Sequence, residues 1–239
     1  SDQWMVGYYE RVMKCAARHR LFVDMHGSYT PKGLYRTYPN LLTYEGVLGM
    51  EQGARCKPEN SNWLPFIRNA VGPMDFTPGS MFSAQPEDNR STGANPMGTG
   101  TRAYQMALYV VFESPLQMLA DNPVLYRREH PCTEFLAAVP TTWDSLRVLR
   151  AACGREVVVA RRKGDKWYVG GITNDRPYTT EIALDFLPAG RTFTKTSFED
   201  GVNADLQATD YRKRVREVDA STVVKVEMVR NGGWAAVIE

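Results

Sequence analysis

LFVDMHGSYTPKGLYRTYPNLLTYEGVLGMEQ, residues 21–52, is the stretch that decides the fold. An apolar run brings Asp24 to the end of a predicted strand, and His26 follows two positions later. Because side chains alternate along a strand, Asp24 and His26 are predicted to project into the same space. After a loop rich in Gly, Pro and Tyr come Glu45 and Glu51, on either side of GVLGM. Neighbouring acids are costly to bury unless they bind a metal, share a proton or act on a substrate. The stretch therefore predicts a polar site at strand ends.

Two of these residues also have ordinary explanations. His26 stands beside a glycine, as a turn histidine does, and Glu45 fits a carboxylate that faces the dipole at a helix start. Residue chemistry alone thus predicts a polar site without choosing a reaction.

The bulk composition sets limits on partners and class. With 239 residues, 43% apolar and 23% charged, the chain is typical of globular protein and long enough for one large domain or two small ones. The net charge of +2 gives no reason to expect a nucleic-acid partner. No apolar run reaches the roughly 18 residues that a membrane span needs. The four cysteines form no C-x-x-C pair, so neither a zinc site nor a disulfide framework is predicted.

The first nineteen residues predict an amphipathic helix. Ser1 or Asp2 is the expected N-cap. Apolar residues then recur at helical spacing, at Met5, Tyr8, Tyr9, Val12, Met13 and Ala16. A chain that opens directly on a formed helix, without a Met or a signal-like segment, is interpreted as a piece of something longer.

The middle of the chain predicts alternating helices and strands. Residues 61–72 read as a short helix capped by Ser61, residues 98–113 as a strongly apolar helix, and residues 114–123 as a short strand ending in Asp121. Polar residues at strand ends, with helices between, are typical of parallel βα units. In a βα barrel the functional groups lie at that end of the strands.

From Trp143 onward the pattern changes to short alternating runs. Turn signals such as KGD, NDRP and NGG separate them, at the spacing of an antiparallel β-sandwich. Lys163, Gly164 and Asp165 fit a hairpin turn. The basic clusters at 161–163 and 212–216 are interpreted as solvated strand ends or edges.

Longer motifs along the chain resemble the C-terminal part of glycoside hydrolase family 97, a group of exo-acting α-glycosidases. They are SDQWMV, VDMHG, PKGLYRTYPNLLTYEGVLGMEQ, LPFIRNAVGPMDFTPG, ALYVVFESPLQMLADNP, ARRKGDKWYVGGIT and FEDGVNA. The resemblance implies an α/β region at 1–140, the C-terminal half of a (β/α)8 catalytic barrel with strands five to eight. It implies an antiparallel β-sandwich domain at 141–239. The other barrel strands and an N-terminal sandwich would belong to a missing N-terminal region of the same protein.

The resemblance also assigns roles. The family's E-x5-E pair falls on Glu45 and Glu51, which makes Glu51 the general acid and Glu45 a Ca²⁺ ligand, with Glu51 as a further metal contact. Calcium takes more oxygen ligands than two residues supply, so another is expected from the N-terminal region. His26 resembles a substrate-binding imidazole. Asp24 is given a supporting role, orienting His26 or a sugar hydroxyl, and Lys32 is a weaker candidate for sugar contact that fits an exposed loop cation equally well.

One position separates the subgroups of the family. Inverting α-glucosidase members carry a Glu directly after the histidine, where this chain has Gly27. Retaining members, including α-galactosidases, resemble this chain there and use an Asp at the end of strand four as nucleophile, expected upstream of Ser1. An inverting enzyme needs a base to activate water, and Gly27 offers none.

The implied function is a retaining, calcium-dependent α-galactosidase that hydrolyses terminal α-linked sugars of an oligosaccharide or glycoside. An α-glucosidase of the same family is one alternative. A non-catalytic carbohydrate-binding remnant is the alternative from another class, and the intact E-x5-E pair argues against it because a binder needs no proton donor. The resemblance places the protein in a bacterial periplasm or outside the cell.

Overall fold

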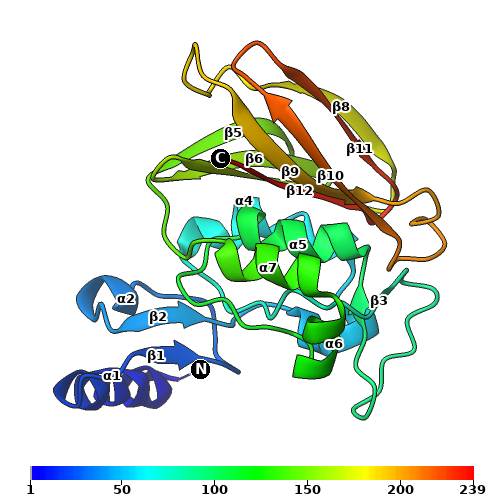
Figure 1. Cartoon of the computed structure of the whole chain (residues 1–239). Coiled ribbons are helices and arrows are strands. Elements are labelled where there is room, and N and C mark those ends of the chain that lie inside the picture. Colours follow the sequence, from blue (N-terminus) through cyan, green and yellow to red (C-terminus); the bar gives the residue numbers. More distant parts are fainter. Residues whose placement is uncertain (1) are drawn as a thin grey trace.

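The computed structural model describes residues 2–239, and its C-terminal sheets lie above the helices and short strands of the N-terminal part (Figure 1). The helices are α1 (Gln3–Arg18), α2 (Leu34–Thr37), α3 (Pro58–Ser61), α4 (Leu64–Ile67), α5 (Arg102–Val111), α6 (Pro123–Arg128) and α7 (His130–Ala138), with the 3₁₀ helices η1 (Met50–Arg55) and η2 (Asn69–Val71). The N-terminal strands are β1 (Val23–Met25), β2 (Leu41–Tyr44), β3 (Ser83–Ala84) and β4 (Gly98–Thr99). The C-terminal strands are β5 (Ser145–Ala152), β6 (Glu156–Lys163), β7 (Lys166–Thr173), β8 (Tyr178–Ala183), β9 (Phe193–Asp200), β10 (Tyr211–Val218), β11 (Val223–Met228) and β12 (Gly233–Ile238).

The predicted first helix is confirmed as α1. Asp2 is its N-cap and accepts a hydrogen bond from the Met5 N–H at 3.0 Å, whereas Ser1 lies outside the described residues. Met13 and Ala16 are buried on the inner face of the helix. Within residues 2–239, no helix combines the length and the apolar character that crossing a membrane requires.

Parallel pairing brings the site-bearing segments to one edge. β1 pairs in parallel with β2, and Tyr44 at the end of β2 forms a further parallel bridge to Met74. The ends of these three segments therefore meet on the same side. A small core of Met13, Met25, Leu41 and Tyr44 supports them from α1.

The predicted helix at 61–72 is only partly correct. It is broken into α4 and η2, and Ser61 ends α3 instead of capping a helix. Pro65 lies in the first turn of α4, where a proline is tolerated, and its ring would collide with the Ser61 carbonyl in a continuous helix, so it separates α3 from α4. Gly72, at φ 138°, then ends the segment.

The predicted strand at 114–123 is wrong. Within the described residues this segment is irregular up to Asn122, which is the N-cap of α6. Its polar groups bond to other segments instead of a strand ladder: Gln117 Nε2 donates to the Tyr109 carbonyl of α5 at 2.9 Å, and Asp121 Oδ2 accepts from the Phe82 N–H at 3.0 Å.

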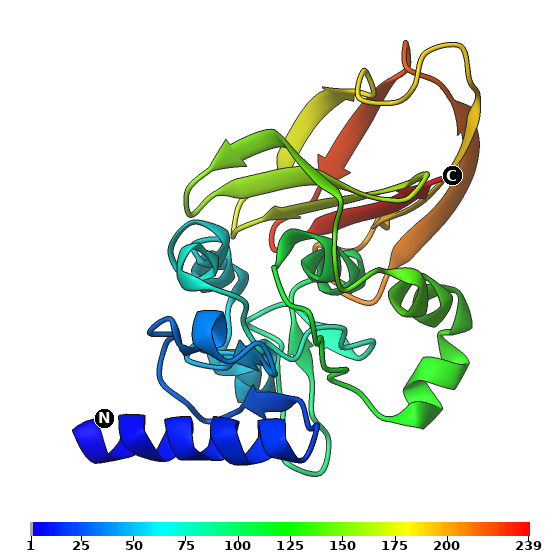
Figure 2. The ribbon, with the colours of Figure 1, turned by 90° about the vertical axis from the view of Figure 1, so that its left-hand side faces the viewer.

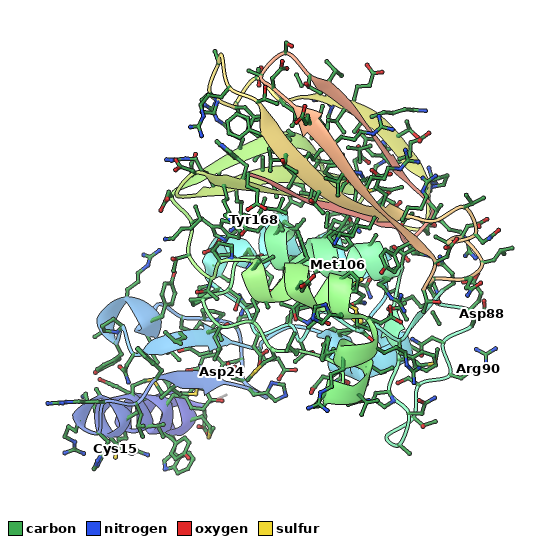
Figure 3. The ribbon with its side chains drawn as sticks, viewed as in Figure 1. Cys15, Asp24, Asp88, Arg90, Met106 and Tyr168 are labelled. Atoms are coloured by element: carbon green, nitrogen blue, oxygen red, sulfur yellow. The ribbon has the colours of Figure 1, made fainter. Side chains whose placement is uncertain are left out.

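The apolar helix predicted at 98–113 is confirmed over Arg102–Val111 as α5, whereas Gly98–Thr99 form β4. Helix α5 joins the two parts of the chain. All its residues are buried, because it lies directly beneath β7 and β12. A Cβ added at Gly233 would come within 2.3 Å of Tyr104 Cα, so the backbones touch there. Met106 of α5 and Tyr168 of β7 lie at this junction in one shared core (Figure 3). Since this core contains residues from both sides of position 140, the domain boundary there stays a prediction.

The antiparallel strands predicted after Trp143 are present. They form a six-stranded sheet in the order β10-β9-β12-β7-β6-β5 and a two-stranded sheet, β11-β8, which packs against one of its faces (Figure 2). The predicted hairpin joins β6 to β7, with Gly164 at φ 58° in its turn.

The two basic clusters differ from each other. β10 is an edge strand, as predicted for 212–216. Arg161, by contrast, is only 6% exposed, which overturns its interpretation as solvated. It pairs with Glu113, donates to the Val111 carbonyl at 3.1 Å and lies over the Trp143 ring.

Candidate active site

His26 is the centre of the cluster at the strand ends. Its Nδ1 lies 2.7 Å from Asp75 Oδ2, and its Nε2 lies 3.2 Å from Glu51 Oε2. Glu45 Oε2 lies 3.8 Å from Nδ1. The structure thus brings together three of the predicted residues, from the turn after β1, the end of β2 and the start of η1.

Asp75 completes the cluster, and sequence analysis gave it no role. Its side chain is fully buried, and its backbone N–H donates to the Tyr44 carbonyl at 2.8 Å, which continues the parallel arrangement one segment beyond β2. By accepting from Nδ1 it fixes the imidazole ring and leaves Nε2 facing Glu51. The available signal was a lone carboxylate in the tight apolar segment GPMDFTPG.

Asp24 reaches the cluster through Asp75 and makes no direct bond to His26. Burial, with the hydrogen bond to Asp75 next, raises the pKa of Asp24 to about 7. The Oδ1 atoms of both carboxyls are buried and have no donor within residues 2–239. Figure 3 shows Asp24 in the N-terminal part, away from the sandwich.

The charge of His26 depends on these neighbours. Its hydrogen bond to Asp75 raises the pKa of His26, and the charges of Glu45 and Glu51 act in the same direction, whereas burial opposes them. The imidazolium form is thereby favoured between carboxylates on both of its nitrogens.

Glu45 is held by the backbone at the end of β2. Its N–H donates to the Met25 carbonyl at 2.9 Å, and its Oε2 accepts from the Gly27 N–H. Arg68 supports this turn from below, with Nη2 donating to the Tyr44 carbonyl at 2.9 Å and the Glu45 carbonyl at 3.1 Å. Burial lowers the pKa of Arg68 to about 10. Sequence analysis missed Arg68, whose only signal was a cation within an apolar segment.

The cluster has a geometry that fits a metal ion. Ligand atoms of His26, Glu45 and Glu51 all lie within 4.8 Å of one another. Oxygen atoms bound to one calcium at about 2.3–2.6 Å can be at most about 5 Å apart, so the three positions are compatible with one ion. Because calcium prefers oxygen, Glu45 and Glu51 fit its shell better than the imidazole does.

Glu51 faces open space. Its side chain is 41% exposed, its backbone N–H donates to Thr77 Oγ1 at 3.1 Å, and Gln52 Nε2 donates to its Oε1 at 3.1 Å. A cavity of about 240 Å³ opens beside it. The cavity is lined by Met50, Glu51, Thr77, Ser80, Ser91, Pro96, Met97, Gly98, Leu119 and Ala120. Thr77 adopts φ 56°, an unfavourable value for a β-branched residue and a recurrent mark of functional loops.

Lys32 is not part of this cluster. It is exposed, and within residues 2–239 no hydrogen bond or ion pair joins it to His26, Glu45 or Glu51. It lines a different groove, next to Leu64 of α4.

Comparison with known proteins shows which family the chain belongs to. Residues 1–47 match the family model described as glycoside hydrolase 97, and residues 142–239 match the one described as glycosyl-hydrolase 97 C-terminal, oligomerisation. The chain belongs to glycoside hydrolase family 97. Among curated members, a retaining alpha-galactosidase of Bacteroides thetaiotaomicron is 42% identical over 100% of this chain and 37% of its own length. A probable retaining alpha-galactosidase of Streptomyces bingchenggensis is 33% identical over 96% of this chain and 33% of its length.

Solved structures of the family agree with this fold. A family 97 enzyme from Pseudoalteromonas sp. strain K8, in complex with acarbose, superposes with a TM-score of 0.88 at 36% identity, over 99% of this chain and 37% of that one. A β-arabinopyranosidase superposes with a TM-score of 0.78 at 29% identity, over 96% of this chain and 36% of that one. The chain thus spans roughly a third of the length of the family members that it matches.

Proposed function

We propose that this chain carries the general acid of a retaining, exo-acting α-galactosidase. The observation that carries the proposal is the placement of Glu51 at the mouth of a cavity, 3.2 Å from an imidazole that Asp75 holds in place. A carboxylic acid beside a cavity is what protonation of a leaving glycosidic oxygen requires. The names of the two curated relatives, a retaining alpha-galactosidase and a probable retaining alpha-galactosidase, support the choice of sugar and of stereochemistry.

Each residue has a defined task in this proposal. Glu51 gives its proton to the departing oxygen and takes one back from the water that completes the reaction. His26, with its ring fixed by Asp75, presents Nε2 on the substrate side and binds a sugar hydroxyl. Asp24 keeps Asp75 in position by sharing a proton with it. Lys32 stays a candidate for contact with a more distant sugar unit, across the loop that it occupies.

Gly27 supports retention. It has φ 65°, which favours glycine, and a Cβ placed there would meet no atom within 4 Å. The position that carries a base in the inverting subgroup therefore offers open space and no carboxylate. A retaining enzyme needs a nucleophile instead, and we place that carboxylate in the region upstream of Ser1.

Calcium is part of the proposal. Glu45 and Glu51 would hold it, with further oxygen ligands from the N-terminal region of the enzyme. Bound there, the ion would supply positive charge that offsets the clustered carboxylates. Without it, His26 is the only ion-pair partner that Glu45, Glu51 and Asp75 have among residues 2–239.

We further propose that residues 1–140 are the C-terminal half of a (β/α)8 barrel. The parallel order from β1 through β2 to Met74 supports this. So do the exposed apolar side chains of Trp4, Leu21 and Phe22, 64%, 59% and 75% exposed, because surfaces of this kind are commonly covered by another part of the protein. The rest of the barrel is the proposed cover, in a protein of the bacterial periplasm or exterior.

An assay of the enzyme that contains this chain tests the function. Aryl α-galactoside, α-glucoside and β-arabinopyranoside would be compared with calcium present and after chelation. The proposal predicts preference for the α-galactoside and a loss of activity on chelation that calcium restores. Preference for the α-glucoside would favour the alternative within the family. Binding of sugar without hydrolysis of any substrate would favour a non-catalytic carbohydrate-binding protein, and activity indifferent to chelation would remove calcium from the account.

A further inference from the structure

A second, charged groove lies in the sandwich, in the part of the chain that does not carry the candidate active site. It has a volume of about 360 Å³ and is bounded by β9, β10 and the edge of β11. Its floor is set by the strand register, which places Arg212 opposite Glu199, Arg214 opposite Ser197 and Arg216 opposite Lys195. Cross-strand partners share a face of the sheet, so these six side chains project together. We call this groove, with these six residues as its floor, the sandwich groove.

The sandwich groove interrupts an otherwise apolar layer. Between the two sheets, β7 and β12 contribute apolar side chains such as Val169, Trp234 and Ile238. Among the described residues, β10 contributes only Val218 to this core, and the second sheet consists of β11 and β8 alone. Charged residues occupy the positions that the sandwich pattern would fill with apolar ones.

Positive charge exceeds negative charge on this floor. Lys195, Arg212, Arg214 and Arg216 are cations, and Glu199 is the single carboxylate among the six. Glu199 Oε2 lies 3.2 Å from Arg214 Nε and 4.0 Å from Arg212 Nη2, so its charge is already shared. At the rim, Glu227 is engaged by Lys225 at 2.6 Å. Glu217 adds one exposed acid at the end of β10.

Arg216 and Lys195 place two positive charges directly opposite each other on neighbouring strands. Like charges directly opposite each other destabilise a sheet. Lys195 is only 4% exposed, donates to Ser197 Oγ at 3.0 Å and lies over the Trp234 ring at 5.2 Å. Burial lowers the pKa of Lys195, and the charges of Arg216 and Arg214 add to this effect while Glu199 opposes it. Arg216 has no ion-pair partner among residues 2–239.

A donor within the groove also lacks an acceptor. Arg212 Nε is buried and makes no hydrogen bond to any described residue. An oxygen atom from outside the protein would satisfy it. Guanidinium groups are suited to this, since their planar donors match the two oxygens of a carboxylate, sulfate or phosphate.

We propose that the sandwich groove binds the oxyanion group of a small ligand, a carboxylate, sulfate or phosphate, between Lys195 and the three arginines of β10. The groove volume lies in the range of small-molecule sites and accommodates a ligand of monosaccharide size. An acidic sugar and a free inorganic anion share this chemistry. The site is separate from the candidate active site and does not depend on the proposed reaction.

Calorimetric titration of the enzyme that contains this chain tests the proposal. Sodium galacturonate, sulfate and phosphate would be titrated separately, against sodium chloride at matched ionic strength. The proposal predicts saturable binding of at least one of the three oxyanions and none of chloride. Binding of galacturonate alone would identify an acidic sugar, and binding of sulfate or phosphate a free anion. Equal responses to all salts would overturn the proposal, because they would reflect ionic screening alone.

Two matched variants locate the site. Arg216→Gln should weaken oxyanion binding by about tenfold or more, because it removes an unpaired charge-assisted donor. Arg147→Gln, which removes an exposed arginine of β5 outside the groove, should leave binding unchanged. Equal losses in both variants would overturn the proposal. A change of oligomeric state in Arg216→Gln with unaltered anion affinity would also overturn it, and would assign the arginines to contacts between copies.

A stability measurement separates binding from a structural role. In the absence of oxyanions, Arg216→Gln should unfold at the same temperature as the unaltered protein or higher, because the substitution relieves the repulsion with Lys195. Added oxyanion should raise the unfolding temperature of the unaltered protein but not that of the variant. A marked loss of stability in the ligand-free variant would show that Arg216 serves the fold, and would contradict the proposal.

Discussion

Two buried acid sites in this chain are built in opposite ways. Asp200, at the end of β9, is 3% exposed and accepts hydrogen bonds from Thr101 Oγ1 at 2.6 Å, the Val229 N–H at 3.0 Å and the Gly233 N–H at 3.1 Å. At the strand ends, by contrast, Asp24 and Asp75 face each other, and Glu45 and Glu51 lie around one imidazole.

The difference separates a structural acid from a chemical one. A carboxylate surrounded by donors is satisfied within the protein, and Asp200 thereby ties the N-terminus of α5 to β9 and β12. Carboxylates that face one another need protons, a metal or a substrate from outside. Four predictions test this contrast, from the largest expected effect to the smallest.

Glu51→Gln should have the largest effect. A general acid contributes about 10²–10⁴-fold, so hydrolysis of natural α-galactosides by the enzyme that contains this chain should fall by that range. Substrates with good leaving groups should be much less affected, since they need no proton. Steady-state kinetics on both kinds of substrate, with the exposed Glu59→Gln as control, measure this. Equal losses on both would remove Glu51 from the acid role.

Features that depend on residues close together along the chain could be predicted from the sequence, and contacts between distant residues could not. Helices α1 and α5 were predictable because capping and apolar spacing are local. His26 and Glu45 were predictable as neighbours because parallel strand ends meet at one edge.

Residues with distant partners were missed. Asp75 meets His26 across 49 positions, and Arg161 meets Glu113 across 48, so neither contact has a local pattern. The prediction of a strand at 114–123 failed for a related reason: nothing in this apolar run bounded by prolines indicated that its polar groups would bond to α5 and to the loop at Phe82.

Asp200→Ala should reduce the free energy of unfolding by about 3 kcal/mol or more, because it leaves buried donors without an acceptor. Burial raises the pKa of Asp200 to about 7. A folded-state pKa above the unfolded one means that stability falls as pH rises from about 4 to about 7. The variant should therefore lose less stability between pH 5 and pH 8 than the unaltered protein does, as urea titrations at both values would show. A loss of unfolding free energy below about 1 kcal/mol would mean that Asp200 does not hold α5 to β9 and β12.

Asp75→Asn should act on catalysis more than on substrate affinity. It keeps the shape of the side chain but weakens the bond that fixes His26, so kcat should fall by about 10–100-fold with a smaller change in KM. The alkaline limb of the pH profile should also move to lower pH, because Asp75 is the main cause of the raised pKa of His26, and without it the imidazolium form is lost at a lower pH. Asp88→Asn, an exposed substitution, is the control. An unmoved profile would make Asp75 merely structural.

Asp24→Asn should have the smallest effect. With a pKa of about 7, Asp24 is protonated at pH 5, and an amide then replaces a neutral acid. Because the folded-state pKa is raised, Asp24 costs stability as pH rises from about 4 to about 7, and the asparagine does not. Thermal unfolding with chelator present should show little change at pH 5 and a relative gain for the variant at pH 8. If the unfolding temperature of the variant, relative to that of the unaltered protein, were lower at pH 8 than at pH 5, the proposed proton shared by Asp24 and Asp75 would be contradicted.

The central claim is that these strand-end carboxylates belong to a retaining α-galactosidase, and the configuration of the first product tests it most directly. Proton NMR of an aryl α-galactoside, recorded on the enzyme that contains this chain before mutarotation, reads which anomer of galactose appears first. The open position at Gly27 predicts α-galactose, released by double displacement. Early β-galactose would contradict the account, because it would require a base that activates water where this chain has none at Gly27.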